Sequence, residues 1–159
     1  MNELPNTPGT YALVFRNHTQ RRIPVGALGE VVLMRGYYIY VGSAFGPGGL
    51  RARVGRHARI EKTKHWHIDY LRPHLSLIEA WYTSDPEKLE HRWAGLLERE
   101  LSVAWPRFGA SDCRCPAHLF YASTLPTGLL PDGHRCNPEV DPGISVVITS
   151  LVNLRPVIT

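Results

Sequence analysis

Apolar and polar positions alternate most regularly over residues 37–44 of this 159-residue chain. Tyr38 and Tyr40 fall on one face of an extended segment, and the residues between and beside them fall on the other. Aromatic and β-branched side chains in this order predict a β-strand. Glycine and proline crowd into residues 46–49, so the strand is expected to end before them.

Other short apolar runs are bounded by turn-forming residues and predict further strands. Two runs separated by Gly26 and Gly29 predict an additional hairpin over residues 23–34. The remaining strands are predicted at residues 9–15, 75–82, 119–121 and 144–149.

Helical spacing replaces alternation after residue 48, where Leu50, Val54 and Ala58 recur at i, i+4 and i+8. A second, short helix is predicted over residues 65–71. A long helix is expected to begin at Ser84-Asp85-Pro86, since these residues combine a cap with a proline in the first turn. Its core stripe consists of Leu89, Trp93, Leu96, Leu97 and Leu101.

Composition places these elements in one globular domain. Hydrophobic residues make up 43% of the chain and charged residues 20%, as in ordinary soluble proteins. No apolar run reaches the roughly 18 residues that span a bilayer, and residues 1–5 lack the features of a signal peptide, so we expect a cytoplasmic protein. The expected fold class is α/β (α+β), a small antiparallel or mixed sheet flanked by helices, over residues 7–122. A loop-rich extension, 123–159, follows.

Positive charge is concentrated between residues 51 and 67, where six Lys or Arg residues face one Glu. A field of this kind favours a polyanionic partner, and nucleic acid is the expected one. The candidate contacts are Arg51, Arg56, Lys62, Lys64, His65 and His67.

Two features of this region allow more than one interpretation. The loop 46–49 precedes a helix and is either a phosphate cradle or a plain turn, although no Gly-Lys-Ser/Thr follows it as in a Walker loop. Trp66 either stacks on a base or packs in the protein.

Three cysteines are an odd number and argue against a disulfide framework. Cys113, Cys115 and His118, with His134 or Cys136, provide enough ligands for zinc. The alternative is a structural loop that supports the rim of a site.

Two tripeptides, Gly9-Thr10-Tyr11 and Tyr40-Val41-Gly42, lie on predicted strands and are followed by Leu50-Arg51-Ala52-Arg53-Val54-Gly55-Arg56-His57. In this order and context the chain resembles the GIY-YIG nuclease family over residues 7–108. It resembles most the branch that is found alone or attached to endonuclease III-type glycosylases. The features shared with that branch are Gly42-Ser43-Ala44, Arg56-His57, residues 65–71 and residues 108–115.

The resemblance implies a metal-dependent endonuclease with Mg²⁺ (or Mn²⁺), acting on nucleic acid and foremost on DNA in repair- or structure-directed cleavage. Tyr40 or Tyr11 would orient or deprotonate the attacking water, and Arg53 would grip the scissile phosphate. His57 would be a hydrogen-bond partner or proton shuttle. The same resemblance suggests partnership with a DNA glycosylase.

The family's metal ligand is a glutamate on the long helix, and the helix phase narrows the choice. At 100° per residue, Glu90 lies about 55° from the centre of the apolar stripe and Glu98 about 135°. Because a ligand must face the sheet edge, Glu90 is preferred over Glu98.

Two departures from the family pattern matter. The spacing from Tyr11 to Tyr40 is long, which the hairpin over 23–34 would absorb. Compact members also place an asparagine after the metal helix, and none lies between residues 101 and 121, where Ser111 or Asp112 would substitute. Two alternatives to the nuclease follow: a catalytically inactive nucleic-acid-binding module on the same scaffold, and a zinc-stabilised adaptor protein.

Overall fold

The computed structural model describes residues 2–110, 115, 117–126, 134–137 and 147–149. The strands are β1 (Asn2–Glu3), β2 (Gly9–Asn17), β3 (Arg21–Pro24), β4 (Glu30–Leu33), β5 (Gly36–Ala44), β6 (Ser76–Thr83), β7 (Ser102–Val103), β8 (Leu119–Ala122), β9 (His134–Asn137) and β10 (Val147–Thr149). The α-helices are α1 (Gly49–Ala58), α2 (His67–Leu71) and α3 (Glu90–Glu100).

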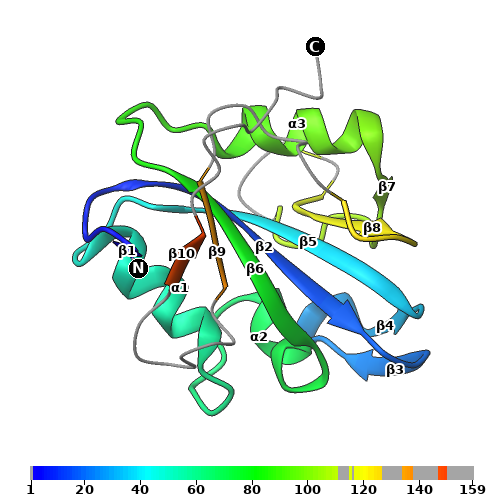
Figure 1. The fold of residues 1–159 in the computed structure, drawn as a ribbon. Helices are drawn as coiled ribbons and strands as arrows, with labels where there is room; N and C mark the ends of the chain where they lie inside the picture. Colours follow the sequence, from blue (N-terminus) through cyan, green and yellow to red (C-terminus); the bar gives the residue numbers. More distant parts are fainter. Residues whose placement is uncertain (1, 111–114, 116, 127–133, 138–146, 150–159) are drawn as a thin grey trace.

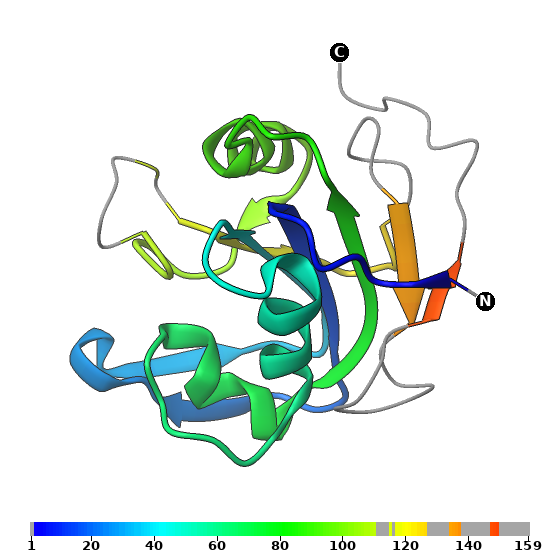
Figure 2. The ribbon, with the colours of Figure 1, turned by 90° about the vertical axis from the view of Figure 1, so that its left-hand side faces the viewer.

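A twisted antiparallel sheet runs through the molecule, with the long strands β2, β5 and β6 at its centre (Figure 1). Within the described residues the strand order is β1-β10-β9-β6-β2-β5-β8-β7, and every pair is antiparallel. The hairpin β3–β4 forms a separate two-stranded sheet. Helix α3 covers one face, and α1, α2 and the hairpin cover the other (Figure 2). The expected small α+β fold is therefore confirmed.

The two faces of the sheet carry two separate hydrophobic cores, because side chains alternate along each strand. Tyr11, Leu13 and Phe15 of β2 pack with Leu50 and Val54 of α1. Their neighbours Ala12 and Val14 pack instead with Trp93 and Leu97 of α3. Strand β5 divides in the same way, with Tyr38 and Tyr40 toward α1 and with Ile39 and Val41 toward α3, as the alternation predicts.

The start of α3 differs from the prediction. The cap-and-proline signal at residues 84–86 forms a turn, in which the Asp85 carboxylate accepts a hydrogen bond of 2.9 Å from the Glu87 N–H. The helix begins only at Glu90. The N–H of the preceding residue, Leu89, donates to the Thr10 hydroxyl at 3.1 Å. A contact from a distant strand thus fixes the helix start, and the predicted start at Ser84 is wrong.

Helix α3 ends at Glu100, because residues 102–103 leave it to pair with β8 as β7. The predicted strand at 144–149 corresponds to β10. Strand β9, which was not predicted, pairs with β6 and with β10, so residues beyond 123 join the central sheet.

In the part of the chain described here, every helix is too short or too polar to cross a membrane.

Candidate active site

A polar pocket of about 230 Å³ opens where β2 begins and β5 ends, between helices α1 and α3. Four of the five residues singled out for catalysis and metal binding line it: Tyr11, Tyr40, Arg53 and Glu90. Its other lining residues are Gly42, Ser43, His65, Trp66, His67 and Gly109. Residues from two strands, three helices and two loops therefore meet at one opening.

The strand register brings the two tyrosines together. Tyr11 lies opposite Gly42 in the β2–β5 ladder, and Tyr40 lies two residues along from Gly42 on the same face. Gly42 is required here because a Cβ at this position would overlap the Tyr11 hydroxyl. The second tripeptide thus provides both a phenol, at Tyr40, and the space that the other phenol occupies.

His57 stands one layer behind the pocket, with its ring 2% exposed. Its Nε2 lies 2.8 Å from the Tyr11 hydroxyl, and its ring packs 5.8 Å from the Tyr40 ring, centroid to centroid. Burial, helped by the nearby charge of Lys62, lowers the pKa of His57 to about 3. The ring is therefore neutral at neutral pH, and it acts on the pocket through Tyr11.

Both phenols are also held neutral. Burial raises the pKa of Tyr11 and of Tyr40 well above 10, although the adjacent Arg53 guanidinium acts in the opposite direction. Proton transfer from Tyr11 to His57 would therefore be strongly uphill. The arrangement suits hydrogen bonding by neutral hydroxyls better than proton abstraction by a tyrosinate.

Arg53 is half-buried, and its own chain holds it in place. Its Nη1 donates to the Ser43 carbonyl oxygen at 3.0 Å, and its guanidinium lies 4.7 Å from the centre of the Trp66 ring. The Arg56 guanidinium lies 4.3 Å from the same ring, and Trp66 is itself half-buried. Trp66 thus packs with the arginines, which favours the packing interpretation of this residue.

Glu90 enters the pocket from the first turn of α3. The Ser43 hydroxyl donates to its Oε1 at 2.6 Å, and His118 Nδ1 lies 2.7 Å from its Oε2. Burial alone would raise the pKa of Glu90, but the bonds from His118 and Ser43 lower it below its usual value. Glu90 is therefore a carboxylate, whereas the rival Glu98 is exposed on the outer side of α3.

The donors around Glu90 fit Mg²⁺. A single ionised carboxylate, the Ser43 hydroxyl and two phenols are all oxygen groups, which hard cations prefer. Each carboxylate oxygen retains a second lone pair beyond the contact that it makes.

Two of the predicted nucleic-acid contacts are used inside the protein. Arg56 binds the buried Asp69 carboxylate through two nitrogens, at 3.1 and 2.9 Å. Lys62 donates to the backbone carbonyls of Arg56 and His57 at 2.9 and 3.2 Å. Burial lowers the pKa of Lys62 to about 8. These side chains hold the end of α1 and the segment before α2 in place.

The other predicted contacts lie nearer solvent. Arg51, Lys64 and His65 are exposed, and His67 is half-buried, with its Nδ1 accepting a bond of 2.9 Å from the Gly109 N–H. A second groove adjoins the pocket, sharing Arg53 and Trp66 with it. Its further basic lining residues are Arg56 and Arg59.

The loop at residues 46–49 is a turn. In the first turn of α1, the Gly49 N–H is bonded to the Gly46 carbonyl at 3.2 Å, and the N–H groups of Leu50 and Arg51 are bonded to the carbonyls of Thr7 and Pro5 at 2.9 Å each. A phosphate cradle needs such groups unbonded, so that interpretation is not supported.

Sequence reasoning missed the partners of Glu90. The sequence marks Ser43 only as part of a family tripeptide and His118 only as a candidate zinc ligand. Both are far from Glu90 in the chain, so no periodic pattern indicates that they contact it. Ser111 and Asp112, the suggested substitutes for the family asparagine, lie outside the described residues, as does Cys113.

Comparison with known proteins gives one match. Neither a curated protein nor a solved structure matches the chain. Residues 10–130 match the family model described as Domain of unknown function DUF123. Apart from Gly9, this match covers strands β2 to β8, helices α1 to α3 and every residue lining the pocket. The chain belongs to the DUF123 family.

Proposed function

We propose that this protein is a metal-dependent endonuclease that hydrolyses phosphodiester bonds in nucleic acid, foremost DNA. The observation that carries the proposal is the meeting of two phenols, one guanidinium and one ionised carboxylate at a single polar pocket. The resemblance to GIY-YIG nucleases assigns this set of residues to phosphodiester cleavage. By the same resemblance, a repair- or structure-directed role beside a DNA glycosylase is proposed. The cytoplasmic location expected from the sequence is part of the proposal.

Arg53 binds the scissile phosphate in this proposal. Its Nη1 is anchored on the Ser43 carbonyl, so the guanidinium is already oriented before substrate arrives. A planar fork of donors suits phosphate oxygens, and charge that develops on them is stabilised most strongly by a donor already in place.

The two tyrosines orient the attacking water. Because both hydroxyls are neutral, each can accept and donate a hydrogen bond, which fixes the direction of a water molecule's lone pair. His57 does not line the pocket; it is a positioning residue, which holds the Tyr11 hydroxyl from behind at 2.8 Å.

Glu90 would hold Mg²⁺ or Mn²⁺, with water filling the remaining positions. When bound, the metal supplies Lewis-acid stabilisation of charge on the phosphoryl and leaving oxygens. Ser43 and His118 keep the Glu90 side chain in one orientation and ionised.

Binding of the substrate backbone falls to the exposed basic residues. Arg51, Lys64 and His65 are exposed, His65 lines the pocket itself, and the adjoining groove adds Arg59. Each phosphate that they neutralise releases counterions, so binding should weaken steeply with salt.

The test is incubation of the full chain with nicked, branched and abasic DNA and with structured RNA, in Mg²⁺ or Mn²⁺ and then with chelator. Cleavage of at least one substrate, abolished by chelator, is expected. Intact substrates with salt-sensitive binding would instead identify the inactive binding module, for which the missing asparagine is the main support. If the protein neither cleaves nor binds any of these substrates, the zinc-stabilised adaptor is the hypothesis that remains.

A further inference from the structure

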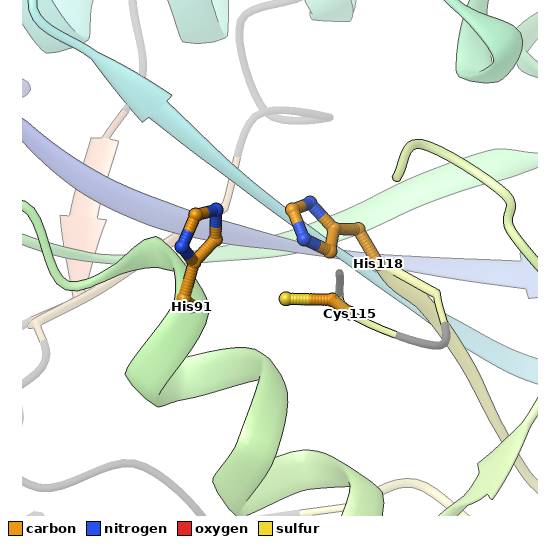
Figure 3. Close-up of side chains that lie close together, drawn as sticks. All are labelled: His91, Cys115 and His118. Carbon is orange, nitrogen blue, oxygen red and sulfur yellow. The ribbon is translucent and has the colours of Figure 1, made fainter. Parts of the chain in front are cut away.

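A second cluster of metal-binding side chains lies beside the candidate active site. His91 of α3, Cys115 and His118, which directly precedes β8, place one ligand atom each within 4.8 Å of one another. Figure 3 shows the two imidazoles and the thiol turned toward a common space between the helix and the segment that leads to β8. The Arg107 Nη1 holds the Cys115 carbonyl at 2.8 Å, so the position of the cysteine is supported by the chain around it.

The donor set is that of a zinc site. One thiolate and two imidazoles suit zinc, whereas the oxygen donors of the neighbouring pocket suit Mg²⁺. In a tetrahedral zinc site the ligand atoms are about 3.4–3.6 Å apart, by the usual Zn–N and Zn–S lengths. The present ligand atoms lie within 4.8 Å of one another, so they need to approach by about 1 Å to bind zinc. His91 is exposed, so its side chain can turn inward by this amount.

The contact between His118 and Glu90 would orient His118 as a metal ligand. His118 Nδ1 faces Glu90 Oε2 at 2.7 Å, so Nε2 is the nitrogen that would ligate a metal. A histidine that ligates a metal through one nitrogen characteristically donates a hydrogen bond to a carboxylate through the other. His118 is 2% exposed, so this orientation is fixed by burial as well.

We propose that His91, Cys115 and His118 bind a zinc ion that ties the segment before β8 to the start of α3. Three protein ligands leave one position of the ion for water. By fixing His118, the ion also holds Glu90 at the wall of the pocket. The site differs from the sequence-based expectation, which included Cys115 and His118 but not His91. It stands whether or not the protein cleaves nucleic acid.

The first experiment measures zinc in the full chain by mass spectrometry after dialysis, and then replaces zinc with Co²⁺. We expect about one zinc per chain and, with Co²⁺, a thiolate-to-cobalt charge-transfer band. Cys115→Ser should lose the band and His91→Ala most of the bound metal. His18→Ala, which removes an exposed histidine bonded to Ser76, is the matched control and should keep both.

The second experiment tests the shared carboxylate. Glu90→Gln should lower zinc affinity about 10- to 100-fold, as loss of an outer-shell partner does, while the exposed Glu98→Gln should not. Circular dichroism establishes that each variant is folded. His91→Ala changes only a surface side chain, so it decides the matter even if Cys115→Ser fails to fold. A wild-type chain without zinc or a cobalt band, or a His91→Ala variant with unchanged zinc affinity, would overturn the proposal.

Discussion

Replacing His57 by glutamine should flatten the dependence of folding stability on pH. The His57 pKa is about 3 in the folded protein, because the ring is buried, against an ordinary value of 6.5. The unfolded chain therefore takes up a proton well before the folded chain does. The stability that depends on a neutral His57 is fully present above the pKa of the unfolded chain. It is lost progressively as the pH falls from about 6.5 toward about 3.

The magnitude follows from the same two values. At about pH 5 the histidine is protonated in the unfolded chain but not in the folded one. Since pH 5 lies about 1.5 units below the unfolded pKa, at about 1.4 kcal/mol per unit, the folded state loses about 2 kcal/mol of stability relative to about pH 7.5. In a chain of this length, 2 kcal/mol corresponds to roughly 4–8 °C in Tm. Glu90, Asp69 and His67 also have lowered pKa values, but they are common to both proteins and cancel in the comparison.

Urea unfolding followed by tryptophan fluorescence measures the effect at the two pH values. His57→Gln replaces the imidazole that bonds the Tyr11 hydroxyl, so the variant is expected to be less stable than wild type at both pH values. Only the change in unfolding free energy between the two pH values is therefore compared. Wild type should lose about 2 kcal/mol more than the variant on acidification. His18→Gln controls for the loss of one exposed histidine. Equal losses in wild type and His57→Gln would mean that the ring is not held neutral behind Tyr11.

Three further predictions concern the pocket and its support. Arg53→Ala should lower kcat about 10²- to 10³-fold and weaken DNA binding less than about 10-fold, since one oriented phosphate contact among several is lost; steady-state kinetics and binding titrations would contradict this by showing equal losses. Asp69→Asn should cost about 3–5 kcal/mol in urea unfolding, because the buried carboxylate accepts bonds from Arg56 and two backbone N–H groups; a cost below about 1 kcal/mol would show that the ion pair is dispensable. Gly42→Ala should destabilise wild type by about 1–3 kcal/mol and the Tyr11→Leu variant by less, since the new methyl overlaps both the oxygen and the adjoining ring carbon of the phenol, which leucine lacks; a double-mutant cycle in urea with no coupling would remove the steric argument.

The parts of the fold that local patterns determine were predictable. Alternation in residues 37–44 assigned Tyr38 and Tyr40 to one face, and the two cores confirm it. Spacing at i, i+4 located α1 within a residue or two. The preference for Glu90 over Glu98 came from helix phase alone, and the structure places Glu90 at the pocket and Glu98 in solvent.

Long-range contacts were not predictable. The Thr10 hydroxyl, 79 residues from Leu89, delays the start of α3 despite a strong local cap at Ser84. Arg56 was among the predicted nucleic-acid contacts, but Asp69 binds it by a contact that charge counting does not reveal. His91 and His118 lie on different elements and meet only through the packing of α3 beside β8, so no spacing rule could pair them.

The most direct test of the central claim compares two glutamates on one helix. With Mg²⁺ and the DNA substrate that wild type cleaves, Glu90→Gln should lose cleavage by at least about 10²-fold while still binding DNA, and Glu98→Gln should cleave as wild type does. Cleavage that survives Glu90→Gln, or that Glu98→Gln removes, would contradict the account of this pocket as the site of metal-dependent hydrolysis.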